Sequence, residues 1–206
     1  MRKYSIVLPC FNEAENLKQL VDRFSMFLDE WDFELILVDN GSTDNTAEVL
    51  GELSKNNSDP CIKPHFLKNN IGYGHGIRQG LEVAEGEILA YTHADDQTPP
   101  EDVFRAFELF RSGELDPQKT MVRGKRAGRE KEFLTTRGLS IVASMFIGLK
   151  VEDLNGQPKV FHRSLLKTMR RKVNNFAFDP YVLYCAQKEH FEIYDICNFR
   201  IFFQIL

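Results

Sequence analysis

The sequence lacks the features that mark membrane-spanning, secreted and disulfide-rich proteins. No apolar run approaches the roughly 18 residues that a spanning helix needs. The N-terminal stretch MRKYSIVLPCFNE has a short apolar run and no small-residue cleavage site, so a signal peptide is not expected. The few cysteines show neither zinc-site spacing nor the density of a disulfide framework, which favours a reducing compartment. They are Cys10, Cys61, Cys185 and Cys197.

An excess of positive charge is also absent. The 26 Lys and Arg residues are outnumbered by 30 Asp and Glu residues, which gives a formal net charge of −4. The chain as a whole is therefore not expected to bind nucleic acid, and any anion site must be local. Linkers rich in Gly or Ser, low-complexity segments and internal repeats are missing too. We therefore predict one domain over residues 1–206, divided into halves at about residues 111 and 112.

Strand-like and helix-like patterns alternate through the first two-thirds of the chain. Short apolar or β-rich runs are separated by segments in which apolar residues recur at helical spacing. Helix starts are predicted at Asn12, Asn45 and Thr98, because glutamate follows each of them three residues later. The alternation predicts an α/β fold with a Rossmann-like, mainly parallel central sheet flanked by helices. The predicted strands are 4–9, 33–39, 62–67 and 87–93.

Three polar clusters, CFNE, DNGSTD and HADDQ, each follow a predicted strand. Ligands of parallel α/β sheets bind beyond the carboxyl ends of the strands, so the three clusters are expected to meet at one edge. In HADDQ, Asp95, Asp96 and Gln97 offer oxygen ligands that suit Mg²⁺ or Mn²⁺. On its own this cluster also fits an ordinary polar turn before a helix, so both interpretations stay open.

Two further stretches have a functional and a structural interpretation. In VDNGSTD, Asp39 is able to accept from a nucleobase and Ser42 to contact phosphate or sugar; the alternative is a turn with a helix cap. In NNIGYGHGIRQG, three glycines at 72, 74 and 76 allow close backbone approach beside a helix N-terminus, where a ligand also fits. Their spacing and late position disfavour a dinucleotide fingerprint, which argues against an oxidoreductase.

Taken in order, these stretches resemble the inverting family-2 glycosyltransferases with the GT-A fold. The likeness is closest to the branch of dolichol- and polyprenol-phosphate mannosyl- and glucosyltransferases. It covers roughly residues 4–170 and includes RGKRAG and DLNGQPKVFHRSLL later in the chain. The ordered combination is more specific than any one motif. The resemblance implies a first half that binds a nucleotide sugar and a second half that binds the acceptor.

The resemblance also implies the residues of the donor site. Asp95 is expected to meet the diphosphate and a divalent ion, Mg²⁺ or Mn²⁺, and Gln97 matches an additional metal contact. His93 departs from the pattern, because the family usually has an aspartate there; imidazole is able to ligate Mn²⁺ or to contact phosphate. The metal set is thus His93, Asp95 and Gln97. The nucleotide-binding set is Pro9, Phe11, Glu13, Asp39, Ser42 and Asp95.

A phosphate acceptor would explain the basic stretch RGKRAGREK, because arginine binds phosphate through paired hydrogen bonds. The alternative for a lone charge run is a solvated loop. The resemblance favours Arg126 and Arg137 for the acceptor phosphate, and Asp153 is the candidate base for a hydroxyl acceptor. The acceptor-phosphate set is Arg123, Arg126, Arg137 and Lys159, and the catalytic set is Asp95, Asp153, Arg126 and Arg137. The apolar segment at about 133–149 predicts a helix, either in the core or resting on a bilayer.

These features predict an inverting hexosyltransferase that moves a hexose from a UDP- or GDP-linked donor to a polyprenyl phosphate, either dolichyl or undecaprenyl. We expect it in the cytoplasm, peripheral at the cytoplasmic face of the membrane, held by direct contact or by a separate membrane-anchoring partner. For the short apolar tail ICNFRIFFQIL two interpretations stay open, a truncated C-terminus or a missing C-terminal membrane segment. Two alternatives stay open. One is a transferase to a saccharide or protein hydroxyl, and the other is a catalytically silent module that binds a nucleotide or a partner.

Overall fold

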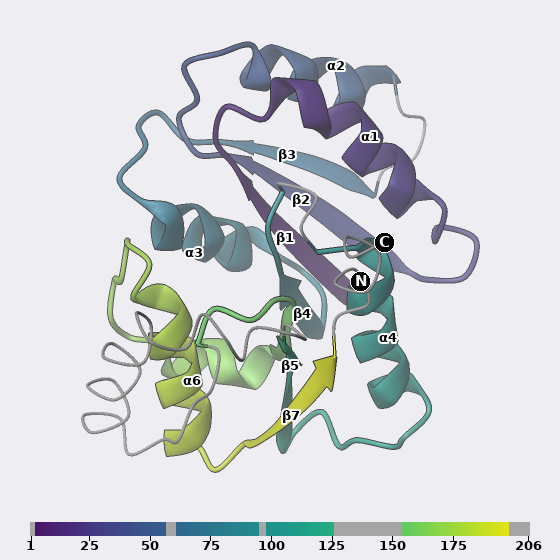
Figure 1. The fold of residues 1–206 in the computed structure, drawn as a ribbon, viewed down its shortest axis with the longest axis vertical. Helices are drawn as coiled ribbons and strands as arrows, with labels where there is room; N and C mark the ends of the chain where they lie inside the picture. Colours follow the sequence, from purple (N-terminus) through teal and green to yellow (C-terminus); the bar gives the residue numbers. More distant parts are fainter. Residues whose placement is uncertain (1–2, 57–60, 95–97, 126–153, 198–206) are drawn as a thin grey trace, which may run out of the picture.

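The computed structural model describes residues 3–56, 61–94, 98–125 and 154–197. Their strands form one seven-stranded sheet with the order β3-β2-β1-β4-β6-β5-β7 (Figure 1). All neighbouring pairs are parallel except those of β6, which runs antiparallel to both β4 and β5. The predicted α/β fold with a mainly parallel sheet is confirmed. The strands are β1 (Tyr4–Cys10), β2 (Phe33–Asp39), β3 (Ile62–Phe66), β4 (Ile88–Tyr91), β5 (Thr120–Lys125), β6 (Lys159–His162) and β7 (Glu192–Cys197).

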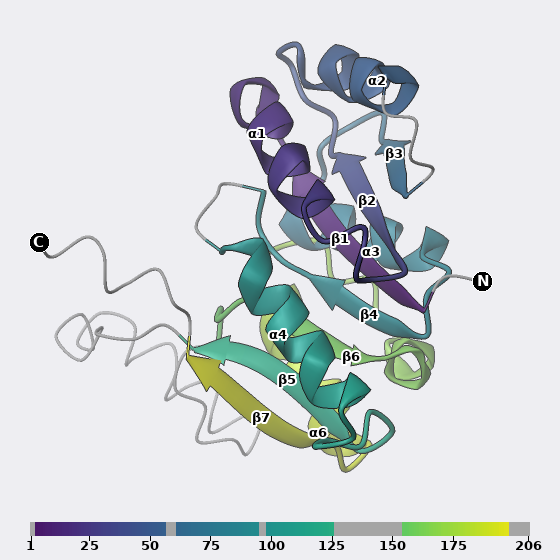
Figure 2. The same cartoon turned by 90° about the vertical axis from the view of Figure 1, so that its right-hand side faces the viewer.

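Helices cover both faces of the sheet (Figures 1 and 2). On one face α1, α2 and α4 enclose a core that includes Leu17, Leu50 and Phe104. On the other face α3 and α6 enclose a second core around Ile77 and Val182. Strand β2 is buried along its whole length, as expected for an apolar run covered from both sides. The helices are α1 (Ala14–Ser25), α2 (Thr46–Asn56), α3 (Tyr73–Val83), α4 (Pro100–Arg111) and α6 (Phe178–Lys188), with a 3₁₀ helix over Arg163–Thr168.

Two of the three predicted helix starts are wrong in detail. Helix α1 has Glu13 at its N-cap position, and Asn12 instead adopts a left-handed φ of 57° and accepts from the backbone N–H of Thr43. Helix α4 begins one residue later than predicted, with Pro99 rather than Thr98 at the N-cap position. Asn45 does directly precede α2. The predicted helix at about 133–149 lies outside the described residues.

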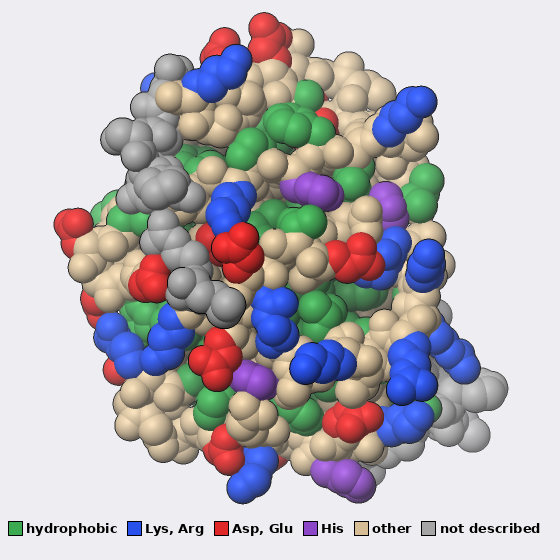
Figure 3. Space-filling model, turned by 180° about the vertical axis from the view of Figure 1, so that it is seen from behind, with side chains coloured by type: hydrophobic (Ala, Val, Ile, Leu, Met, Phe, Trp, Pro, Cys, Tyr) green, Lys and Arg blue, Asp and Glu red, His purple; other side chains and the backbone are tan. Residues whose placement is uncertain are grey.

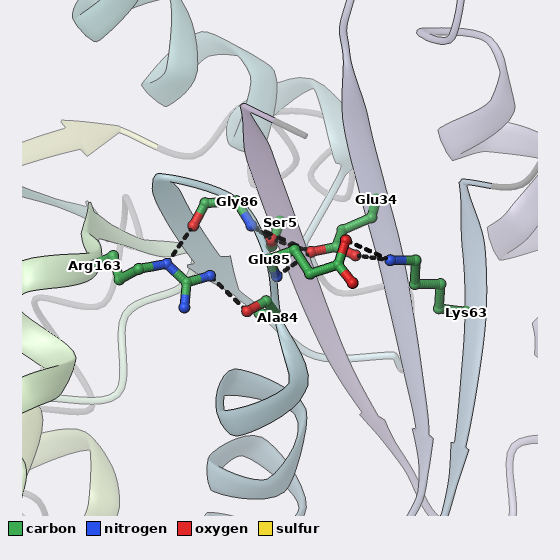
Figure 4. Close-up of polar contacts among 7 residues, drawn as sticks. All are labelled: Ser5, Glu34, Lys63, Ala84, Glu85, Gly86 and Arg163. Atoms are coloured by element: carbon green, nitrogen blue, oxygen red, sulfur yellow. Dashed lines mark hydrogen bonds and ion pairs between the residues drawn. The ribbon is translucent and has the colours of Figure 1, made fainter. Parts of the chain in front are cut away.

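A buried carboxylate holds the edge of the sheet at which β1 and β2 begin (Figure 4). Glu34 accepts from the Ser5 hydroxyl and the backbone N–H of Glu85, both at 2.5 Å, and its other oxygen lies 2.7 Å from Lys63 Nζ. Arg163 holds the same turn through the carbonyl oxygens of Ala84 and Gly86, at 2.5 and 2.7 Å. The turn that leads into β4 is therefore fixed from two sides, and β4 in turn carries the segment that includes His93.

Candidate functional site: the edge beyond strands β1, β2 and β4

The loops that follow β1 and β2 are tied together at the carboxyl edge of the sheet. The strands run parallel in register, and the backbone N–H of Asn40 donates to the Cys10 carbonyl at 2.8 Å. Beyond them, the backbone N–H of Asn12 donates to Ser42 Oγ at 3.0 Å, and that of Thr43 donates to Asn12 Oδ1 at 2.9 Å. Two of the three polar clusters identified in the sequence therefore form one unit, and Ser42 contributes to it as an acceptor.

This unit contains three acidic side chains, Glu13, Asp39 and Asp44, and Asp44 Oδ2 accepts from the backbone N–H of Ala14 at 3.4 Å. Asp39 is 4% exposed, and its Oδ1 accepts from the backbone N–H of Ser42 at 2.9 Å. Glu13 lies at the start of α1, where its carboxylate accepts from the Asn16 amide at 2.7 Å. Burial, followed by the charges of Glu13 and Asp39, raises the pKa of the Cys10 thiol far above its ordinary value. Cys10 is therefore a neutral core thiol and not a nucleophile.

A pocket of about 320 Å³ opens beside these loops. Its volume is within the usual range for small-molecule sites. The lining side chains carry no formal charge, and Phe11 is 44% exposed on it. Two of the predicted nucleotide-binding residues, Pro9 and Phe11, thus share this surface. The pocket is lined by Pro9, Cys10, Phe11, Asn40, Asn70, Gly72, Tyr73 and Phe176.

The glycines of NNIGYGHGIRQG are required by the chain itself. A Cβ on Gly72, whose φ is 124°, would lie 2.3 Å from the Asn174 carbonyl oxygen, and one on Gly74 would lie 2.6 Å from Phe178 Cβ. The same Asn174 carbonyl accepts from the backbone N–H of His75 at 3.1 Å, in the first turn of α3. The segment before α6 thus contacts the start of α3, while Gly72 and Tyr73 also line the pocket, so a ligand beside this helix N-terminus stays a prediction.

Beneath the pocket, three donors converge on one buried carboxylate oxygen. Asp179 Oδ1 accepts from Tyr91 Oη at 2.8 Å, Gln157 Nε2 at 3.1 Å and Lys159 Nζ at 2.7 Å. Gln157 Nε2 also donates to the Tyr73 hydroxyl at 3.2 Å. Asp179 lies in the first turn of α6, so this network connects α6 with β4, β6 and the pocket wall.

His93 lies at the same edge as this network. It follows β4, and its ring centroid is 5.5 Å from that of Tyr73, with the two ring planes inclined at 31°. Because β4 runs parallel to β1 as its direct neighbour, the third polar cluster begins beside the first. The sequence prediction that the clusters converge is met by the described parts of all three.

A model of a known protein family matches most of the chain. Its description is "Glycosyl transferase family 2", and it matches residues 5–174. The chain belongs to this family. Curated relatives are the undecaprenyl-phosphate 4-deoxy-4-formamido-L-arabinose transferases of Proteus mirabilis, 29% identical over 185 residues, and of Yersinia pestis, 30% identical over 175 residues. These alignments cover 87% and 84% of the chain but only 55% and 50% of the relatives, so the chain spans about half their length.

Solved structures confirm that this family-2 chain has the GT-A fold. Glucosyl-3-phosphoglycerate synthase from Mycobacterium tuberculosis, in complex with Mn²⁺, UDP and glucosyl-3-phosphoglycerate, matches with a TM-score of 0.73 at 20% identity, covering 96% of this chain and 70% of that one. A complex of the same enzyme with Mg²⁺ and UDP also has a TM-score of 0.73, at 21% identity, with coverage of 96% and 69%. The predicted family and fold are both confirmed.

Two of the residues predicted to bind the acceptor phosphate form ion pairs inside this family-2 domain. Lys159 is fully buried against Asp179, and Arg123 is 5% exposed, with its Nε and Nη2 each 2.8 Å from an oxygen of Asp195. A buried cation already paired with a carboxylate is poorly placed to bind an incoming phosphate, because separating the pair leaves a charge uncompensated. Their positions favour a structural role for both, in place of the predicted phosphate contact.

Several residues of the predicted site lie outside the part of the chain that the structure describes. The residues are Asp95, Gln97, Arg126, Arg137 and Asp153. Within the described ranges, no group of three or more His, Cys, Asp or Glu side chains is arranged to hold a metal ion. Across the same ranges, no helix is long and apolar enough to cross a bilayer. On the face opposite to that of Figure 1, described Lys and Arg side chains are interspersed with acids (Figure 3).

Sequence reasoning assigned no binding role to five residues of the pocket wall, one of which is Cys10. Asn40, Asn70 and Tyr73 stand beside residues that the motifs did single out, so proximity in sequence was a usable signal for them. Phe176 lies about 100 residues further on, in a segment that matches no motif, and its place became visible only in three dimensions.

Proposed function

We propose that this chain is an inverting glycosyltransferase that moves a sugar from a nucleoside-diphosphate donor to a polyprenyl phosphate. Family membership and the names of the curated relatives support this choice of reaction and acceptor. Uridine is the first candidate for the nucleoside, since the similar synthase structures contain UDP. Transfer of a hexose in particular stays a prediction. Because only half of the relatives' length is matched, activity and acceptor are proposals for the chain rather than properties read from it.

The observation that carries the proposal is the gathering of the polar loops after β1, β2 and β4 around one pocket. The β1 and β2 loops are tied through Asn12, Ser42 and Thr43, while His93 reaches the pocket wall through Tyr73. The lining side chains are uncharged, which suits the nucleoside part of a donor better than its diphosphate. We assign binding of the diphosphate to the segment that continues from His93 to Gln97.

A divalent ion fits the residue types of that segment. His93, Asp95 and Gln97 supply an imidazole, a carboxylate and an amide oxygen, all of which bind Mn²⁺, and the latter two also suit Mg²⁺. When bound, the ion would offset negative charge on the departing diphosphate. The metal-bound solved structures support this cofactor by likeness of fold alone.

The chain's own residues support the remaining steps. Phe11 and the pocket wall orient the nucleoside, so that the anomeric carbon faces the acceptor. The acceptor's phosphate oxygen then bonds to that carbon from the side opposite the diphosphate, the old carbon–oxygen bond breaks, and the configuration inverts. A phosphate monoester needs no general base, because its second pKa of about 6 leaves it an anion at neutral pH.

Asp179 is not available as the base that a hydroxyl acceptor would need, so Asp153 stays the candidate for that alternative. A hydroxyl acceptor needs a base within hydrogen-bonding reach. Asp179 is 1% exposed and already accepts from Lys159, Gln157 and Tyr91, so it is not free to take a proton from a substrate. We assign binding of the acceptor phosphate to Arg126 and Arg137, and contact with the cytoplasmic face of the membrane to the protein's own surface or to an anchoring partner.

Glycolipid synthesis tests the whole proposal. UDP- and GDP-sugars are incubated with undecaprenyl or dolichyl phosphate, with Mn²⁺ or with a chelator, and the organic phase is assayed for transferred sugar. We expect product with one nucleotide class and loss of product with chelator.

In matched assays, Asp95→Ala should abolish the gain in nucleotide affinity that Mn²⁺ gives, and Arg137→Ala should reduce transfer while nucleotide affinity is kept. Lys119→Ala, at an exposed cation before β5, is the control and should change neither. Transfer to a saccharide but not to a polyprenyl phosphate would overturn the acceptor assignment.

A further inference from the structure

Phe176 is an exposed aromatic residue on the rim of the pocket. It is 70% exposed, it belongs to the pocket lining, and its ring stacks on Tyr73 with a centroid separation of 5.1 Å and an interplanar angle of 17°. Nearly parallel stacking leaves one face of the Phe176 ring covered by Tyr73. The opposite face is therefore available to a further flat group.

The position of Phe176 is fixed by its neighbours in sequence. Asn175 Oδ1 accepts from the backbone N–H of Ala177 at 3.0 Å, and the Asn175 carbonyl accepts from that of Phe178 at 3.0 Å. Asn174 is held against the first turn of α3 by its bond from the His75 N–H, at 3.1 Å. A short, doubly anchored segment thus presents Phe176 to the pocket, which limits the entropy lost when a ligand is bound.

The backing ring is anchored as well. Tyr73 begins α3, its hydroxyl accepts from Gln157, and its ring neighbours those of both Phe176 and His93. Through Tyr73, Phe176 on the pocket rim is thus connected to His93 at the end of β4. Movement of Phe176 is therefore restricted from behind, as a stacking surface requires.

The chemistry of the pocket limits what is able to stack there. Its two exposed rings, Phe11 and Phe176, offer flat apolar surface, while Asn40 and Asn70 offer amides. The Asn40 amide nitrogen donates to Asn70 Oδ1 at 3.3 Å and to the Gly72 carbonyl at 3.0 Å. These two bonds orient the Asn40 amide. Its own oxygen, Asn40 Oδ1, is buried and has no hydrogen-bond partner among the described residues. Flat surface combined with amide groups and no formal charge suits a neutral heteroaromatic ring that carries N–H donors.

We propose that Phe176 is a nucleobase-contacting residue that stacks on the base of the donor. It belongs to the second half of the chain, whereas Phe11 belongs to the first. This inference rests on the proposed function, because it assumes a nucleotide donor. It adds a specific consequence: the donor site is completed by the segment before α6 and is not confined to the motif-bearing first half.

Substitution at position 176 tests this role through nucleotide binding. UDP and GDP are titrated in the presence of Mn²⁺ into the wild-type chain and into Phe176→Ala, Phe176→Leu and Phe176→Trp. Alanine substitution at a base-stacking position weakens binding by roughly five- to a hundredfold, so Phe176→Ala should lose that much affinity. Leucine keeps apolar bulk without a flat ring and should also lose affinity, while tryptophan should keep it. Tyr184→Ala, at an exposed ring on α6 that does not line the pocket, is the matched control and should bind as wild type.

Fluorescence supplies a readout that a merely structural role would not move. The single native tryptophan, Trp31, is 5% exposed in the core, so emission that changes on nucleotide addition to Phe176→Trp reports on position 176. We expect stacking of the base to quench that emission. Wild-type affinity in Phe176→Ala, or unquenched emission in a Phe176→Trp variant that binds, would overturn the role of Phe176. Neither result would contradict the proposed donor site. Failure of the wild-type chain to bind either nucleotide would overturn the proposed function and this inference together.

Discussion

Lys159 Nζ lies 2.7 Å from Asp179 Oδ1, and neither side chain is more than 2% exposed. The ion pair joins β6 to the first turn of α6, with Tyr91 of β4 donating to the same oxygen. Burying two charges costs several kcal/mol per ion, and close pairing with additional hydrogen bonds offsets that cost. Through Tyr91, the pair thus connects β4 in the first half of the chain with β6 and α6 in the second half.

Removing one partner of this ion pair should destabilise the protein strongly. Asp179→Asn leaves Lys159 buried without a counter-charge, so we expect the free energy of unfolding to fall by about 3–5 kcal/mol. Lys159→Met should have a similar effect, and the double variant should cost clearly less than the sum of the two single changes, because it leaves no lone charge. Urea unfolding of the three variants measures this coupling. An exposed ion pair, Lys119 with Asp116, is the control: Lys119→Met should leave stability unchanged. Additive losses at 159 and 179 would contradict the account.

The space around three glycines predicts opposite effects of alanine substitution on stability. Two of them lie at the start of α3 and one lies in α2. Gly72→Ala and Gly74→Ala place a Cβ against the segment before α6, and Gly72 also has a φ of 124°. Each should lower the free energy of unfolding by about 1–3 kcal/mol. At Gly51, inside α2, nothing lies within 4 Å of the position that a Cβ would take, so Gly51→Ala should raise stability by about 0.5–1 kcal/mol. Thermal unfolding distinguishes the two outcomes, and a stabilised Gly72→Ala would show that the segment lies elsewhere.

The sequence predicted the order of strands and helices well because each element carries its own periodic pattern. The continuous apolar run of β2 marked a strand covered on both faces, and its burial follows directly. Helix caps were predicted less well, because a suitable side chain at the expected position, as at Asn12 and Thr98, does not ensure that it caps the helix. Asn12 binds the β2 loop at Thr43 instead of capping its own helix.

The candidate site was only partly predictable for a related reason. Two motif residues of the pocket wall, Pro9 and Phe11, were predicted because their neighbours in sequence mark a strand end. The glycines at 72 and 74 predicted a close approach but not its partner, which lies about 100 residues away in sequence. Lys159 and Arg123 looked like phosphate ligands because charge alone does not reveal an internal partner such as Asp179 or Asp195.

The buried carboxylate of Glu34 predicts a loss of stability in acid. Burial raises its pKa, but hydrogen bonds from Lys63, Ser5 and the Glu85 backbone outweigh burial, so the net pKa is lowered (Figure 4). A lowered folded-state pKa contributes stability above the unfolded value of about 4.3, and this contribution is lost as pH falls through the folded pKa. Glu34→Gln should cost about 2–3 kcal/mol at pH 7 and should flatten the fall in stability as the pH drops below the unfolded pKa of about 4.3.

Denaturant unfolding at a series of pH values measures this effect. Glu82→Gln is a suitable control, because Glu82 is half-exposed and pairs with Arg78 on the surface of α3. That variant should follow the wild-type pH profile closely. An identical acid profile for Glu34→Gln and wild type would show that Glu34 does not carry the charge in the folded protein.

His93 provides a prediction that separates a metal ligand from a direct phosphate contact. The ring stands beside Tyr73 at the edge where β4 ends, immediately before the segment that we assign to the diphosphate. If His93 holds the ion, His93→Asp should keep or increase the affinity for UDP in Mn²⁺, because carboxylate oxygen is a stronger ligand for hard cations than imidazole, and His93→Ala should lower it. If the imidazole contacts phosphate directly, aspartate brings like charges together and both variants should lose affinity with or without Mn²⁺. Calorimetric titration of UDP with and without Mn²⁺ distinguishes the two, and circular dichroism confirms that each variant is folded. Equal affinity of wild type and His93→Ala under both conditions would remove His93 from the donor site.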